Sequence, residues 1–129
     1  MNQPELVYSS IAALSGLIAR RAVSPREVCE AHLARIKAVD PTLHCYVNLL
    51  EEESRRAAIV AEGEIARGGY KGPLHGIPVG IKDNLGMKGV RSAGGSKLLK
   101  DFIPDHDAAS VESLKRAGAI ITGKLNSPG

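Results

Sequence analysis

The first half of the chain, as far as Gly68-Gly69, carries its apolar residues at helical spacing. Ser9 or Ser10 can cap a short amphipathic helix, and Arg20 and Arg21 suit its C-terminal end. The apolar face of this predicted helix is formed by Ile11, Leu14, Leu17 and Ile18.

Two further helices are expected before the glycine pair. The run Ser24-Pro25-Arg26-Glu27 predicts a capping box with proline at the first helical position, and this helix should stop before Asp40-Pro41. A short extended piece at residues 44–49 separates it from an alanine- and charge-rich helix over Glu51 to Arg67, which the glycines end. The charged residues at the start of the third helix are expected on a solvated face. The buried face of the second helix is marked by Val28, Leu33, Ile36 and Val39.

The second half of the chain is rich in glycine and short apolar runs. Residues 77–82 predict a strand, Asp107 can cap a helix that Gly118 ends, and residues 119–122 predict a second strand. A strand, a crossover helix and another strand place the two strands in parallel with a right-handed connection. We therefore expect an α/β fold, in which N-terminal helices precede part of a mixed sheet flanked by helices.

Composition excludes several classes of protein. The 129 residues are 43% hydrophobic and 24% charged, which suits one globular domain and neither a disordered nor a fibrous chain. No apolar run approaches a membrane span and the N-terminus lacks the features of a signal peptide, so we expect a cytoplasmic protein without membrane contact. The net charge of +3 is spread along a chain with few aromatic residues, which argues against nucleic-acid binding. Cys29 and Cys45 lack zinc-site spacing and are expected as reduced thiols.

Lys82 stands out because it ends an apolar strand. In that strand Lys82 shares its face with Pro78 and Gly80, which leave room beside an ammonium group. Open α/β sheets build their sites beyond the carboxyl ends of strands, and Asp83-Asn84 begins a turn there. A partly buried lysine can serve as a base toward a serine hydroxyl. A lysine that simply reaches water from a strand end would give the same spacing.

Other candidate sites are weaker. Residues 118–125 nearly spell a phosphate-binding P-loop, but Leu125 stands where the magnesium-binding hydroxyl belongs. The run Asp105-His106-Asp107 offers metal ligands, yet three consecutive residues converge poorly on one ion, so a solvated loop is expected. His75 fits either a structural hydrogen bond or a substrate contact.

A series of motifs resembles the N-terminal part of an amidase signature enzyme. The main one is GPLHGIPVGIKDN at residues 72–84, and SPREVCEAHLARIKAVDPTLHCYV at residues 24–47 resembles the leading helices of the family. Together the motifs cover nearly the whole chain in order. The others are Gly89-Val90-Arg91, Gly95-Ser96-Lys97, Asp107-Ala108, residues 114–119 and residues 123–126.

The resemblance implies a hydrolase that cleaves a carboxamide C–N bond to acid and ammonia. Family members use a serine nucleophile, a second serine in a cis peptide that relays the proton, and a lysine as the final base. Lys82 matches that lysine, and backbone N–H groups near the nucleophile are implied to hold the oxyanion. The resemblance implies no metal and no cofactor. A glutaminase subunit of a tRNA-dependent amidotransferase resembles simple amidases over this region and remains an alternative.

The chain departs from the family pattern at its end. Both family serines lie downstream of Gly129, and Ser96 matches a glycine-serine-lysine stretch that is not the nucleophile. We therefore expect residues 1–129 to be the N-terminal portion of an amidase signature domain. Residues 1–68 would form a helical lead-in and residues 69–129 the start of the catalytic core.

The expected partners follow from this interpretation. The substrate is a small-molecule amide, and homo-oligomers or complementation by a C-terminal portion are both possible. Alone, the 129 residues are predicted to be inactive. A truncated, non-catalytic remnant that binds a partner is the alternative from another functional class.

Overall fold

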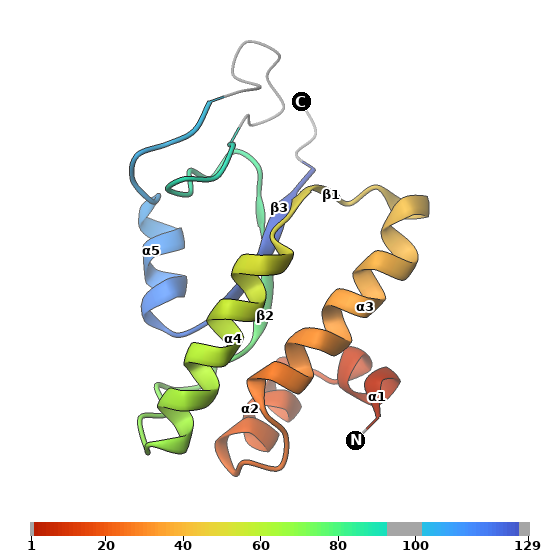
Figure 1. Cartoon of the computed structure of the whole chain (residues 1–129), viewed down its shortest axis with the longest axis vertical. Coiled ribbons are helices and arrows are strands. Elements are labelled where there is room, and N and C mark those ends of the chain that lie inside the picture. The colour runs from red at the N-terminus through yellow and green to blue at the C-terminus, as the bar shows by residue number, and fades with distance from the viewer. Residues whose placement is uncertain (1, 93–101, 127–129) are drawn as a thin grey trace.

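The computed structural model describes residues 2–92 and 102–126, and its mixed α/β architecture confirms the predicted class (Figure 1). The helices pack around a sheet of three strands. The helices are α1 (Gln3–Tyr8), α2 (Ile11–Ala19), α3 (Pro25–Leu43), α4 (Glu51–Ala66) and α5 (Ala109–Arg116), and the strands are β1 (Tyr46–Leu49), β2 (Pro78–Lys82) and β3 (Ile120–Leu125).

The three strands lie in the order β1-β3-β2, so β3 is the central strand. As predicted, β2 and β3 are parallel and joined through α5, while β1 pairs with β3 in the antiparallel sense. The register places Ile81 beside Lys124 and Lys82 beside Leu125. The sheet therefore contains one parallel and one antiparallel pair of strands. Residues that pair in it lie up to about 80 positions apart along the chain.

Helix starts follow the predicted chemistry. The Ser24 side chain accepts a hydrogen bond from the Glu27 amide at 3.1 Å, and the Glu27 carboxylate accepts one from the Ser24 amide, which completes the capping box of α3. Ser10, rather than Ser9, caps α2 by accepting from the Ala13 amide. Helix α1 was not predicted.

The expectation that the second helix stops before Asp40-Pro41 is wrong, because α3 continues through Pro41 to Leu43. Pro41 removes one backbone donor, but it does so in the last turn, where few helical bonds remain to be lost. The Asp40 carboxylate then accepts from the amides of Cys45 and Tyr46, which satisfies the chain as it leaves the helix.

The predicted cap at Asp107 is also wrong. Helix α5 begins one residue later, with Ala108 at its N-cap and no side-chain cap. The Asp107 carboxylate instead accepts from the Lys88 amide at 2.8 Å and from the Lys115 ammonium at 2.9 Å. It therefore joins the segment after β2 to the last turn of α5.

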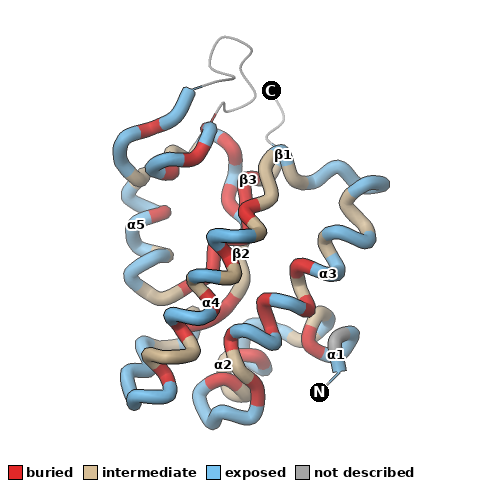
Figure 2. Tube along the Cα trace, viewed as in Figure 1, coloured by how far each residue is buried: buried red, intermediate tan, exposed pale blue. Residues whose placement is uncertain are grey.

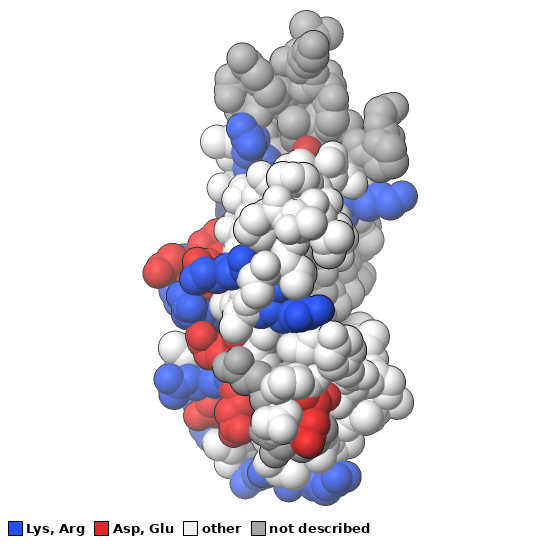
Figure 3. Space-filling model, turned by 90° about the vertical axis from the view of Figure 1, so that its right-hand side faces the viewer, with Lys and Arg blue, Asp and Glu red and all other residues white. Residues whose placement is uncertain are grey.

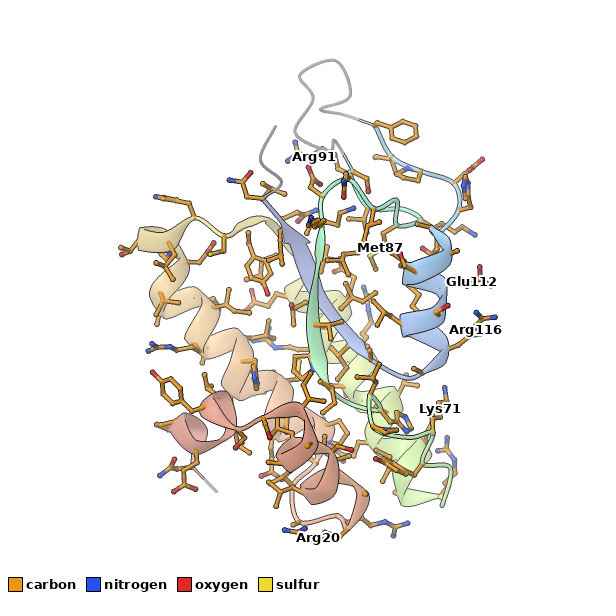
Figure 4. The ribbon with its side chains drawn as sticks, turned by 180° about the vertical axis from the view of Figure 1, so that it is seen from behind. Arg20, Lys71, Met87, Arg91, Glu112 and Arg116 are labelled. Carbon is orange, nitrogen blue, oxygen red and sulfur yellow. The ribbon has the colours of Figure 1, made fainter. Side chains whose placement is uncertain are left out.

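Buried residues lie where the helices and the strands face one another (Figure 2). Helix α4 crosses the face of the sheet that is turned to the viewer in Figure 1, and the reverse view shows β2 and β3 in front of it (Figure 4). A central cluster of buried residues joins β2, β3 and α5, comprising Leu50, Ile81, Met87, Val90, Val111 and Ile121.

Charged residues form pairs across the helices. Arg55 of α4 lies 2.6 Å from Glu30 of α3, and Lys37 lies 2.7 Å from Glu51. Lysine and arginine side chains are interspersed with acidic ones on the face shown in Figure 3. None of the helices in the described part of the chain has the length and apolar character of a membrane span.

Candidate active site at the carboxyl end of β2

Lys82 is the last residue of β2, as predicted, and its side chain is exposed. Ile81 packs into the central cluster, so alternation along the strand turns Lys82 to the opposite face of the sheet. The exposed Gly80 shares that face. Lys82 therefore lies at the carboxyl end of a parallel strand, on a face that the described residues leave open.

The space beside Gly80 does not serve Lys82, contrary to the sequence interpretation. A Cβ atom on Gly80 would lie 3.0 Å from Cγ of Leu125, the residue paired with Lys82 across the sheet. A side chain at position 80 would crowd the Leu125 side chain that lies over it. The expected partial burial of Lys82 is likewise not provided by the described residues, among which its side chain is exposed.

The turn after Lys82 is held by backbone hydrogen bonds. The Leu85 amide donates to the Lys82 carbonyl at 3.0 Å, and the Asp83 amide donates to the Leu125 carbonyl at 3.0 Å. Asp83 itself is only 5% exposed. The end of β2 is thus fixed both within its own turn and to the neighbouring strand.

A second lysine, Lys124, lies on the other side of the sheet, and sequence reasoning missed it. Lys124 is 0% exposed and pairs with Ile81. Its ammonium donates to the Leu85 carbonyl and, at 2.8 Å, to the Ser92 hydroxyl. Burial lowers the pKa of Lys124 below its ordinary value, while the nearby Asp83 carboxylate opposes that shift.

The opposite end of β2 is organised around His75, which is 0% exposed. Its Nδ1 accepts from the Lys71 amide at 3.0 Å, so Nε2 carries the proton and donates to Glu64 at 3.0 Å. A Cβ on Gly118, where φ is +83°, would overlap the imidazole ring. Of the two roles open to His75, the structural hydrogen bond is the one these contacts describe.

The weaker candidates take ordinary places. The residues of the near P-loop form β3 rather than a phosphate-binding loop. Ser96 lies outside the described residues. Cys29 and Cys45 are free, and burial, aided by Glu30, raises the pKa of Cys29 to about 11.

A groove of about 640 Å³ lies on the same side of the sheet as α4. Its walls come from α4, from the segment after β2, from the end of α5 and from β3, and they include Val60, Met87, Lys115 and Ile121. Lys82 is not among its lining residues, because its side chain points to the other face. The groove and the candidate base are therefore separate features of the surface.

Residues 27–129 match the protein-family model described as Amidase. The chain belongs to the amidase family. This match confirms the resemblance that the motifs indicate. The matched region includes β2, the strand that bears Lys82.

Curated relatives of this amidase-family chain include a glutamyl-tRNA(Gln) amidotransferase subunit from Carboxydothermus hydrogenoformans. The two sequences are 43% identical over 122 residues, which is 95% of this chain and 25% of that protein. The corresponding protein from Geobacter metallireducens gives the same identity and coverage. The chain thus spans about a quarter of the length of the curated relatives it matches.

Solved structures agree with the family assignment. The native peptide amidase from Stenotrophomonas maltophilia superimposes with a TM-score of 0.88 at 31% identity, covering 97% of this chain and 26% of that one. A fatty acid amide hydrolase gives a TM-score of 0.93 at 24% identity, with 98% and 22% covered, a likeness of fold. The described helices and strands therefore have the arrangement found in these enzymes.

Proposed function

We propose that Lys82 is the general base of an amide-hydrolysing enzyme of which this chain forms a part. The observation that supports the proposal is the position of Lys82 at the carboxyl end of a parallel strand, within the motif GPLHGIPVGIKDN. Sites in open α/β sheets gather at this edge. The turn that follows is held to β3 by a backbone hydrogen bond, which suits a group that must be placed accurately.

The proposed chemistry is acyl transfer through two serines that belong to the family's downstream segment. The hydroxyl of the nucleophile attacks the amide carbonyl, its proton passes to the bridging serine, and the proton of that serine passes to the neutral amine of Lys82. The proton then leaves with the departing nitrogen as the C–N bond breaks, which yields ammonia and an acyl-enzyme. Water releases the acid. Backbone N–H groups hold the oxyanion.

This chemistry is compatible both with a simple amidase and with the glutaminase component of an amidotransferase. The higher identity to amidotransferase subunits, 43% against 31% for the peptide amidase, favours glutamine as the amide donor. The two functions are separated by comparing ammonia release from glutamine with release from simple aliphatic and peptide amides. A rate constant that is much larger for glutamine supports the glutaminase role.

The test of Lys82 requires the rest of the catalytic machinery. We define the completed enzyme as residues 1–129 joined to the remaining three quarters of the related C. hydrogenoformans protein and purified with the other subunits of that amidotransferase. In this protein Lys82→Ala should abolish ammonia release from glutamine. Retention of most of the activity in a folded Lys82→Ala variant would show that Lys82 is only a strand end.

By itself, the 129-residue chain is expected to hydrolyse no amide. It holds no serine in the sequence context of the family nucleophile, and Ser96 stands in a different motif. Turnover by a homogeneous sample that disappears in Ser96→Ala would contradict this expectation. The alternative, a non-catalytic chain that binds a partner, predicts a stable complex with the C-terminal portion of a relative but no activity in that complex.

The isolated chain is also expected to be marginally stable or to self-associate, because two strand edges of the described sheet lack a neighbour. Residues 119–122 do not form an edge, because β3 is paired on both sides. The outer side of β2 and that of β1 have no neighbour in the described sheet. Sharp cooperative unfolding of a species with monomeric mass in sedimentation would count against this prediction.

A further inference from the structure

Lys124 is an unusual residue for the centre of a sheet. It lies in β3, which is paired on both sides, and its side chain is 0% exposed. Removing an ammonium group from water is unfavourable unless its donors find good acceptors. A methionine or leucine would fill a similar volume without that penalty. The presence of a charged group therefore calls for an explanation in terms of what it binds.

The acceptors of Lys124 belong to two segments that follow β2. One is the backbone carbonyl of Leu85, and the other is the hydroxyl of Ser92 at 2.8 Å. Ser92 in turn donates to the Val90 carbonyl at 3.0 Å and accepts from the Met87 amide at 3.4 Å. One ammonium group thus ties the turn after β2 and the Met87–Ser92 segment to the central strand.

Leu85 is also the residue that closes the turn of Lys82. Its amide donates to the Lys82 carbonyl, while its own carbonyl accepts from Lys124. A second link runs from the Asp83 amide to the Leu125 carbonyl. Consecutive residues of β3, Lys124 by its side chain and Leu125 by its backbone, therefore hold both sides of the turn that begins at Lys82.

We infer that Lys124 is a positioning residue that fixes the backbone of Lys82 from the opposite face of the sheet. Lys82 projects away from the central cluster, whereas Lys124 lies on the side of Ile81, so the two ammonium groups do not share a face. The functional part of this inference rests on the proposed role of Lys82 as the base. Its structural part, the hold on the turn, does not.

The lowered pKa of Lys124 supports the same view. Burial makes the ammonium form less favourable than in water, so the charge is kept at a cost to stability. A residue that only fills space in the core gains nothing from carrying a charge. A residue that must donate hydrogen bonds to a backbone carbonyl and to a hydroxyl at the same time does gain from its charge, because an ammonium group carries three N–H donors.

Hydrogen exchange tests the structural part directly. In the completed enzyme, Lys124→Met should speed exchange of the Asp83 and Leu85 amides by about 10-fold or more, because their turn opens more often. The Leu50 amide, which donates to the Thr122 carbonyl of β3, should exchange as in the parent protein. Equal protection of the turn amides in variant and parent overturns the inference, whatever the activity.

Steady-state kinetics on glutamine test the functional part. We expect Lys124→Met to lower kcat on the order of 10²-fold, because small displacements of a reacting group have effects of this size. KM should change less than about twofold, since no substrate contact is removed. Lys124→Arg, which keeps donors but is bulkier, should recover part of kcat. The matched control is Lys88→Met, an exposed lysine three residues after Leu85.

Each outcome decides one of the two proposals. If Lys82→Ala is inactive but folded Lys124→Met keeps kcat within about twofold of the parent, the inference is wrong and the proposed base stands. If Lys82→Ala remains active, the proposed function fails, while the exchange result still judges the hold on the turn. If Lys124→Met does not fold, Ser92→Ala takes its place, with a smaller loss of kcat and faster exchange expected at Leu85. Unchanged kcat and exchange in Ser92→Ala overturn the inference.

Discussion

The two ends of β2 have different surroundings, although one continuous motif encodes both. At the N-terminal end His75 is fully buried and bonded on both ring nitrogens, between Lys71 and Glu64. At the carboxyl end Lys82 is exposed and extends from a turn that is bonded beneath it. In Figure 4, Lys71 and Met87 mark the segments before and after the strand. One end is tied into the fold by its side chain, whereas the other carries the side chain that we propose for the chemistry.

The largest effect should come from breaking the chemical end. Lys82→Ala and Lys82→Arg in the completed enzyme should each lower kcat/KM by about 10²–10⁴-fold or more, because arginine keeps its proton and cannot act as the base. Circular dichroism should show both variants folded, since Lys82 is exposed. Substantial activity in folded Lys82→Arg would mean that no proton is transferred at this position.

Substitutions at the N-terminal end of β2 should lower the stability of the protein rather than its catalytic rate. Gly118→Ala places a methyl group against the His75 ring at a positive φ, and we expect it to lower the free energy of unfolding by about 2–4 kcal/mol. In a His75→Ala background the same change should cost only about 1 kcal/mol, because the ring is gone and the backbone strain remains.

Denaturant unfolding of the single and double variants of the completed enzyme measures this difference. The kcat of folded Gly118→Ala should match that of the parent, because position 118 lies at the far end of β2 from Lys82. A fall in kcat with no change in stability would instead indicate that the His75 end takes part in the reaction.

A smaller effect is expected in the pH dependence of stability, which also distinguishes the two ends of β2. Burial acts to raise the pKa of Glu64, but hydrogen bonds from Lys71 and His75 and the charge of Lys71 bring it below its ordinary value. A depressed carboxyl pKa contributes stability above its unfolded value and loses it as the pH falls through the folded value. The contribution of Glu64 should therefore be complete above about pH 4.5 and decline below it.

Unfolding measured between about pH 6 and pH 3 tests this sign, with Glu64→Gln as the variant that cannot titrate. Its stability should fall less steeply with acid than that of the parent. Identical slopes would show that the Glu64 contacts contribute no pH-dependent stability. Lys82 variants should leave the slope of the parent unchanged.

The smallest effects are expected at lysines outside both ends. Lys88→Ala removes an exposed side chain whose backbone amide, not its ammonium, bonds to Asp107, so kcat/KM should stay close to the parent value. Lys97→Ala, at a position outside the described residues, should also keep more activity than Lys82→Ala. An order of Lys82, then Lys124, then Lys88 in lost activity is expected. Any other order would weaken the assignment of roles.

Several features of the molecule could be predicted from the sequence because their causes are local. The Ser24 and Ser10 caps depend on residues three positions apart, and the glycines after α4 end it without distant help. The parallel pair of strands follows from the order strand, helix, strand. Lys82 could be proposed as the base from the sequence alone, because its place in a strand and in a family motif can both be recognised along the chain.

Other features were decided only when distant segments met. The space at Gly80 is taken by Leu125, 45 positions later, and the burial of Lys124 depends on Leu85 and Ser92 after the preceding strand. The position of Asp107 depends on partners in two other segments, Lys88 and Lys115. Caps and strand order are set by neighbours in sequence, whereas burial and hydrogen-bond partners of long polar side chains are set by whichever segments the fold brings within about 3 Å.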